Sequence, residues 1–271
     1  MDPAWNTHRT QLHAAIVKAT RQLLDLVRAN PDMTEADLLF YYQALIEQYG
    51  QAATESAFQA LENSRRAVGL WNDLPEPVLA DLPPVAQVEG TMAWAVNKAA
   101  RTNEGPRVNL HTVAALLAGP LGRLIQQPAR DTIWNSTRAA KTTWARVPGP
   151  KACAFCLMLA SRGGVYTSKQ AALSVTSRSA TRPITRYRNA AAGAGHTYQV
   201  GRPQDAKFHD NCTCIAIESH DPTDLPEVVH KLQEEWYEVT WDERGPMPGQ
   251  AALWQDHIQQ TRPNGETLPP T

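Results

Sequence analysis

All four cysteines of this chain fall into two short clusters, and this spacing constrains the fold more than any other sequence feature. The first cluster is Cys153-x2-Cys156 in KACAFCLMLASRGGVY, and the second is His209-x2-Cys212-x-Cys214 in FHDNCTC. Fifty-two residues separate the clusters. Two thiolates three positions apart can reach one ion, and a histidine with two cysteines on a second loop can complete a tetrahedral site. The spacing therefore predicts a structural metal site that joins two distant segments.

Zn²⁺ suits these ligands because thiolate and imidazole groups bind it well without redox chemistry. The free energy of zinc binding would then contribute directly to folding. Five candidate residues compete for four positions, and the spacing does not decide which one is spare. Two other interpretations stay open, namely disulfides formed outside a reducing cell and buried thiols that bind no metal. The N-terminal segment MDPAWNTHRTQLHAA is not typical of a secretory signal, so we expect a reducing cytosol, where disulfides are disfavoured.

The rest of the pattern predicts a mainly helical protein. Apolar residues recur every three to four positions over residues 5–28 and again over about 34–68, where Thr34 is a good N-cap. Two such helices joined by a short loop would bury their apolar stripes against each other. Further helices are expected over the ranges 87–103, 110–126 and 128–146.

We therefore expect a helical N-terminal region followed by a small α+β zinc-stapled C-terminal module. The proline-rich segment around DLPEPVLADLPP indicates a boundary between them. The predicted divisions are a helical hairpin over 1–72, a linker over 73–87, helices with the cysteine module over 88–220, and an acidic tail over 221–271.

The net charge of −1 hides a strong segregation of charge along the chain. Residues 98–207 hold 17 lysines and arginines against three acids, whereas residues 218–271 hold three bases against eleven acids. A basic region of this kind suggests a polyanionic partner such as nucleic acid. The alternative is that the acidic tail neutralises the basic middle, within one molecule or between neighbouring copies.

The basic insertion over residues 167–207 has little periodicity and many small polar residues. Five of its arginines are candidates for non-specific contact with DNA phosphates, and the alternative is a solvated loop against another subunit. These candidates are Arg178, Arg182, Arg186, Arg188 and Arg202. The expected helix over 128–146 also alternates cations and aromatics at Arg130, Trp134 and Arg138. That row predicts either a solvated helix with its tryptophans in the core, or a surface that faces phosphates.

The order of these motifs resembles the C-terminal module of Mu F-type phage head morphogenesis proteins. That module has an arginine and an asparagine on a helix, a W-x-R-like strand, C-x2-C, a leucine–glycine turn and H-x-x-C-x-C. The matching residues here are Arg130 and Asn135, Trp144 to Arg146, Cys153 and Cys156, Leu159 to Gly164, and His209 to Cys214. The stretch CAFCLMLASRGGVY is most similar to minor capsid proteins of actinobacterial phages. The resemblance covers about residues 125–220, and it departs from the usual pattern at Phe208, Asp210 and Thr213, the last of which replaces an arginine.

The resemblance implies a structural minor capsid protein present in few copies near the portal. Its expected role is head assembly, with DNA packaging or ejection as further roles. Its expected partners are the portal protein, the major capsid protein, viral DNA through phosphate contacts, and further copies of itself. Its expected location is the inside of the virion head, and the host cytoplasm during assembly. No run of eighteen apolar residues predicts a membrane span.

Two other functions remain as alternatives, a capsid maturation protease and a free-standing zinc-ribbon DNA-binding protein. The sequence contains no G-x-S-x-G, H-E-x-x-H or P-loop motif, so we do not expect an enzyme. Cys156 and His209 could form a catalytic pair, but their clustering with further cysteines is more typical of a closed metal site.

Overall fold

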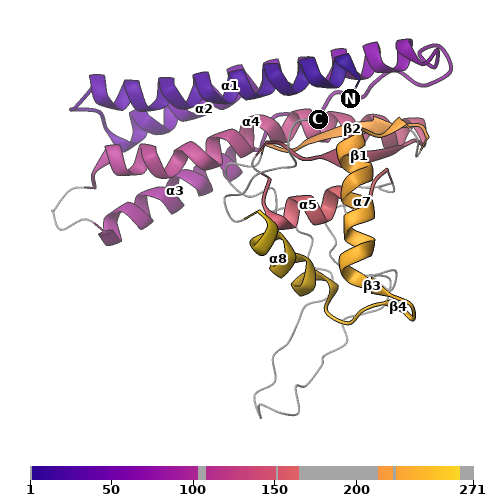
Figure 1. The fold of residues 1–271 in the computed structure, drawn as a ribbon. Helices are drawn as coiled ribbons and strands as arrows, with labels where there is room; N and C mark the ends of the chain where they lie inside the picture. Colours follow the sequence, from indigo (N-terminus) through magenta and orange to yellow (C-terminus); the bar gives the residue numbers. More distant parts are fainter. Residues whose placement is uncertain (1, 103–107, 151, 165–212, 222–223, 263–271) are drawn as a thin grey trace.

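The computed structural model describes residues 2–102, 108–150, 152–164, 213–221 and 224–262. The described part is mainly helical with a small strand portion, as the sequence predicts. Long helices form an extended arm, and a smaller group of strands and short helices lies toward one end of it (Figure 1). No described helix combines the length and the apolar content that crossing a bilayer requires.

The first two helices, α1 (Pro3–Ala29) and α2 (Glu35–Ala67), form an antiparallel hairpin. Their buried stripes follow the predicted periodicity, because residues three and four apart lie on one helix face. A capping box begins α2: the Thr34 hydroxyl accepts a hydrogen bond from the Asp37 N–H, and the Asp37 carboxylate accepts one from the Thr34 N–H. The Thr34 hydroxyl also donates to the Asp37 carboxylate at 2.7 Å, and this hydrogen bond, followed by the one from the Thr34 N–H, lowers the pKa of Asp37.

Helix α3 (Val85–Thr102) packs against α4 (Leu110–Ala140), and α4 also packs against both helices of the hairpin. The sequence predicts a break near Pro128, but α4 is continuous through both Pro120 and Pro128. Both prolines are buried, and Pro128 approaches α2 at Gly50. Tertiary packing therefore maintains a helix that local sequence rules would end.

Residues 143–146 were expected at the end of a helix, and this expectation is wrong. After α4 ends at Lys141 in the left-handed conformation, the chain enters strand β1 (Thr143–Val147). This strand pairs antiparallel with β2 (Ile215–Ser219), with Thr143 opposite Ser219 and Val147 opposite Ile215. Trp144, Ala145 and Arg146 therefore lie on a strand, in agreement with the resemblance rather than with the helical pattern.

The short helix α5 (Ala154–Ala160) follows β1 and is covered by α7 (Glu227–Thr240) and α8 (Gln250–Thr261). A small hairpin, β3 (Trp241–Asp242) and β4 (Gly245–Pro246), connects these two helices. Trp254 of α8 is buried, and its indole N–H donates to the Ala154 carbonyl at 2.9 Å. Glu235 of α7 accepts two hydrogen bonds from Arg262, at 2.6 and 2.8 Å, just beyond α8. These contacts hold α8 on the cysteine-bearing helix.

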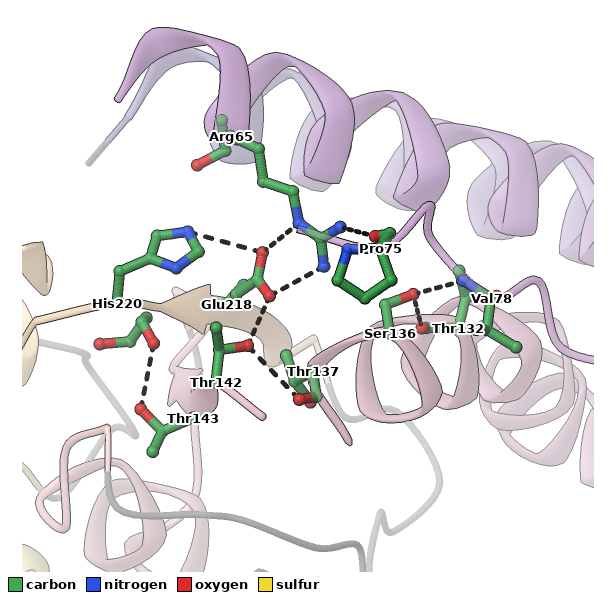
Figure 2. Close-up of polar contacts among 12 residues, drawn as sticks. Arg65, Pro75, Val78, Thr132, Ser136, Thr137, Thr142, Thr143, Glu218 and His220 are labelled. Atoms are coloured by element: carbon green, nitrogen blue, oxygen red, sulfur yellow. Dashed lines mark hydrogen bonds and ion pairs between the residues drawn. The ribbon is translucent and has the colours of Figure 1, made fainter. Parts of the chain in front are cut away.

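A buried ion pair joins the helical arm to the strand pair (Figure 2). Arg65 of α2 donates to both carboxylate oxygens of Glu218 on β2, at 2.7 and 2.9 Å. Both side chains are 0% exposed. Arg65 also donates to the Pro75 carbonyl at 2.7 Å, and the Thr142 hydroxyl donates to Glu218 at 2.6 Å. The pair therefore connects segments that are 153 positions apart in the chain.

The proline-rich segment after α2 is held along α4 by its backbone (Figure 2). The Val78 N–H donates to the Ser136 hydroxyl at 2.9 Å, and the Ala80 N–H donates to the Thr132 hydroxyl at 3.0 Å. Ser136 and Thr132 are themselves buried on α4. The segment thus runs from the ion pair along the surface of α4, rather than away from the arm.

Replacement of Arg65 by methionine is expected to lower the free energy of unfolding by about 3–5 kcal/mol, because it leaves the buried Glu218 carboxylate without its cation. Replacement of both residues, Arg65→Met with Glu218→Met, is expected to lower it less than either single change. The free energy of unfolding of the three variants is measured by urea denaturation, monitored by circular dichroism.

Arg66→Met is the matched control, because Arg66 is the next residue of α2 and forms an exposed ion pair with Glu62. Its expected effect is at most about 1 kcal/mol. If the Arg65 and Arg66 replacements lower the free energy of unfolding equally, the buried ion pair contributes no more to stability than the exposed one.

Candidate metal centre

Three of the five candidate metal ligands lie within the described residues. Cys153 is the N-cap residue of α5 and is half-buried, Cys156 is buried within α5, and Cys214 is buried directly before β2. No disulfide joins any two of these three cysteines. His209 and Cys212 lie outside the described residues, as do the five arginines predicted to contact DNA.

The β1–β2 pairing brings Cys214 and the segment that leads to Cys153 to one end of the strand pair. Val147 is opposite Ile215, so the chain leading to Cys153 leaves β1 where the chain from Cys214 enters β2. Gly149 lies directly against Thr213: a Cβ on Gly149 would be 2.7 Å from the Thr213 carbonyl oxygen. Only a residue without a side chain fits there. The peptide between Cys212 and Cys214 therefore packs onto the loop that precedes Cys153.

Two buried arginines contact this region. The Arg146 side chain, on β1, donates to the Cys156 sulfur, with 3.7 Å between Nη1 and Sγ. Arg130 of α4 donates to the Cys214 carbonyl at 3.2 Å and to the Gln126 side chain at 2.7 Å. One guanidinium group thus contacts the Cys156 sulfur, and the other contacts the backbone of Cys214.

Among the residues that the structure describes, no group of three or more histidine, cysteine or acidic side chains could hold a metal ion. The described cysteines nevertheless fit the chemistry of a thiolate site, because a guanidinium group donates directly to one of the sulfurs. Zinc binding by Cys153, Cys156, His209, Cys212 and Cys214 stays a prediction.

The row of cations and aromatics around α4 is not a surface that faces phosphates. Arg130, Trp134, Trp144 and Arg146 are all buried, and the two tryptophan rings pack 5.4 Å apart. Arg138 alone of the predicted row 130, 134 and 138 is exposed. The first interpretation of this row, a helix with its tryptophan in the core, is therefore the better one, although the cation Arg130 is in the core as well.

A serine–histidine pair occurs in the helical arm, and its geometry does not suit nucleophilic catalysis. His8 Nδ1 lies 2.8 Å from the Ser56 hydroxyl, and that hydroxyl donates to the Gln11 side chain at 2.7 Å. Burial, with a smaller contribution from the positive charge of Arg130, lowers the pKa of His8 to about 4. A general base at neutral pH needs a pKa near 7, so this pair is a weak candidate for proton transfer.

A comparison with protein-family models finds that the VG15 protein family matches residues 3–239. This range covers most of the chain and includes the helical arm, the strand pair and both cysteine clusters.

The chain belongs to the VG15 protein family.

VG15 is a family of viral proteins of phage type, so membership supports the phage assignment in general. No curated protein and no solved structure matches the chain.

Two features of this VG15 protein were missed from the sequence, although a signal for the first of them, the Arg65–Glu218 pair, is present. Arg65 follows Leu61 by four positions on the buried stripe of α2, and a cation on such a stripe requires a buried partner. Glu218 is a lone acid in the apolar strand IAIES. Trp254, which holds α8 on α5, lies in a segment that the composition describes only as an acidic tail.

Acid is expected to destabilise this protein through His8. The pKa of His8 is about 4 in the folded chain and near 6.5 when unfolded, so the unfolded chain binds the additional proton between these values. The stabilisation of the folded state that depends on neutral His8 is fully present above pH 6.5 and is lost as the pH falls toward 4. The free energy of unfolding decreases by about 3 kcal/mol in total. The measurement is the free energy of unfolding between pH 8 and 4, for the wild type and for His8→Gln.

The His8→Gln variant is expected to lose about 3 kcal/mol less than the wild type over this range. His13→Gln is the control, because His13 lies on the exposed face of the same helix. If both variants follow the pH dependence of the wild type, burial of His8 does not cause the acid sensitivity.

Proposed function

We propose that this VG15 protein is a structural minor capsid protein of a tailed phage, acting in head morphogenesis near the portal. The observation that carries the proposal is the match of a phage protein family to residues 3–239. The order of the Arg, W-x-R and cysteine motifs, which resembles Mu F-type head proteins, narrows the role from a phage protein to a component of the head.

The contacts within the chain support a structural role. A long helical arm is joined to a small cysteine-bearing module through the buried Arg65–Glu218 pair, and α8 is held on that module by Trp254. Such a unit can hold a surface of the helical arm and a surface of the cysteine-bearing module at a constant distance from each other. This arrangement suits a protein that contacts both the portal and the major capsid protein. The serine–histidine pair of the arm gives no comparable support to a maturation protease.

Zinc and viral DNA belong to this proposal. Zinc would join the loop before α5 to the segment before β2, through ligands among Cys153, Cys156, His209, Cys212 and Cys214. DNA contact would be non-specific and would use cations of the basic middle region, including Arg178, Arg182, Arg186, Arg188 and Arg202.

Assembly of heads tests the proposed function directly. The chain is co-expressed with the portal and major capsid proteins encoded in the same phage genome, and the purified heads are analysed by quantitative mass spectrometry. We expect the chain in a few copies per head, retained after a high-salt wash. Heads of normal composition that lack the chain would contradict a role as a head component.

A salt titration of DNA binding by the isolated chain separates this function from a free-standing DNA-binding protein. A minor head component whose copies act together is expected to bind weakly as an isolated chain, with binding lost at moderate salt because each phosphate contact adds to the salt dependence. Tight binding by the monomer at physiological salt would favour the zinc-ribbon DNA-binding alternative.

Purified protein is expected to contain one zinc ion per chain by elemental analysis, and Cys153→Ser is expected to reduce that content. Chelation should lower the melting temperature of the wild type, since metal binding contributes to folding. The variant should melt at a lower temperature and respond less to the chelator.

Ala154→Ser is the control for this measurement, because it introduces a serine next to Cys153 in the same helix. Its zinc content and its response to chelation should equal those of the wild type. A wild type that contains no zinc and melts at the same temperature with and without chelator would overturn the zinc assignment.

A further inference from the structure

The outer side of α7, together with the start of β3, exposes acidic and aromatic side chains to solvent. Glu234, Tyr237, Glu238 and Trp241 are all exposed, and their spacings of three and four positions place them on one side of the helix. The Tyr237 and Trp241 rings are 55% and 41% exposed and pack against each other, with 5.3 Å between their centroids. We call these four residues, with Asp242 beside them, the acidic–aromatic surface.

The charges of the acidic–aromatic surface are unfavourable for the helix that carries them. Glu234 and Glu238 are like charges one helical turn apart, and such pairs repel each other. Glu238 and Asp242 also lie at the C-terminal end of α7, where the helix dipole favours cations, and the last turn of α7 holds no basic residue. Among the described residues, neither Glu234 nor Glu238 forms an ion pair, whereas the half-buried Glu235 pairs with Arg262. The described part of the chain therefore leaves this negative charge unbalanced.

A surface of this kind matches arginine and lysine side chains. A cation placed between two carboxylates removes their repulsion, and it also complements the negative end of the helix dipole. The faces of the Tyr237 and Trp241 rings attract the same groups, and arginine in particular stacks on aromatic rings. Exposed aromatic rings are also enriched at protein–protein interfaces. The acidic–aromatic surface is therefore suited to bind a basic region of a protein.

The chain itself supplies a basic region of the required kind. Residues 98–207 hold 17 lysines and arginines against three acids, whereas residues 218–271, which include the acidic–aromatic surface, hold three bases against eleven acids. Exposed cations among the described residues of the basic region include Lys98 on α3 and Arg138 on α4, both in the helical arm. Figure 1 shows β3 and β4 at the end of α7 that points away from this arm. The acidic–aromatic surface of one copy therefore reaches these cations on a second copy rather than on its own chain.

We propose that the acidic–aromatic surface is an interface between copies of this chain, where it binds the basic region of a second copy. The contact is heterologous, because one copy contributes the acidic surface and the other contributes the basic region. Each copy can therefore bind one neighbour through each of its two surfaces. Electrostatic attraction of this kind acts over about 10 Å at about 0.1 M salt and weakens as the salt concentration rises. The interface requires neither zinc nor DNA.

Sedimentation velocity of the full-length chain tests this interface. The sample is first treated with nuclease, because DNA could also join copies through their basic regions. The weight-average sedimentation coefficient is expected to rise with protein concentration at about 50 mM salt, and to stay at the monomer value at about 500 mM salt. A chain that stays monomeric at low salt up to the highest concentration overturns the proposal.

Replacement of the acidic side chains, Glu234→Lys with Glu238→Lys, is expected to weaken self-association at low salt by about 10-fold or more, because like charges then meet across the interface. Lysine forms helices as well as glutamate does, so the stability of this variant to urea should match that of the wild type. Tyr237→Ser with Trp241→Ser leaves the charge unchanged and should also weaken association, because aromatic side chains contribute strongly to binding at interfaces.

Glu47→Lys with Glu55→Lys is the control, because both acids are exposed on α2 and the change in net charge is the same. This control should associate as the wild type does. If the replacements on α2 and those on α7 weaken association equally, net charge rather than the acidic–aromatic surface controls it, and the proposal is wrong.

Isotope labelling identifies which regions meet and in which copies. An equal mixture of unlabelled chains and chains labelled with heavy nitrogen is treated at low salt with a carbodiimide, which joins a carboxylate to a lysine amine in direct contact. Mass spectrometry is expected to find mixed-label peptides that link Glu234 or Glu238 to a lysine of residues 98–207. Cross-links found only between peptides of the same label would place the contact inside a single chain and overturn an interface between copies.

Discussion

In the described part of the chain, the helical arm meets the strand pair at one buried ion pair, between Arg65 on α2 and Glu218 on β2. Both side chains are fully removed from solvent, and the carboxylate accepts three hydrogen bonds, two from Arg65 and one from Thr142. Such a pair adds little net stability compared with apolar residues of the same size, yet either charge alone would be very unfavourable in that position. The helical arm and the strand pair are consequently constrained to meet in one geometry.

The cysteine-bearing helix α5 lies where several of these constraints meet. Arg146 contacts it from β1, Trp254 contacts it from α8, and Thr213 lies against Gly149 in the loop in front of it. Each of these partners is distant from α5 in the chain or belongs to another element. The position of α5 is therefore determined from several sides.

Much of the helical arm was predictable because its information is local. The period of the apolar stripes predicts α1 and α2, and the Thr34 capping box predicts where α2 begins. The prediction was wrong at Pro128 and at residues 143–146, where the local rules conflict with packing. A proline removes one helical hydrogen bond, but the contacts of α4 with three other helices outweigh that loss. For Trp144 and Arg146, pairing with β2 decides the conformation, and the partner strand lies far along the chain.

By itself the sequence determined the mainly helical composition, the clustering of all four cysteines and the order of motifs that resembles phage head proteins. These properties depend on residue type and on spacings of a few positions, so they can be read along the chain. Only the tertiary structure decided that Arg65 pairs with Glu218, that Arg146 points to Cys156 and that α8 lies on α5. The physical reason is that a buried charge or an indole N–H requires a partner without specifying where in the sequence that partner is. The fold makes this choice by bringing distant segments together.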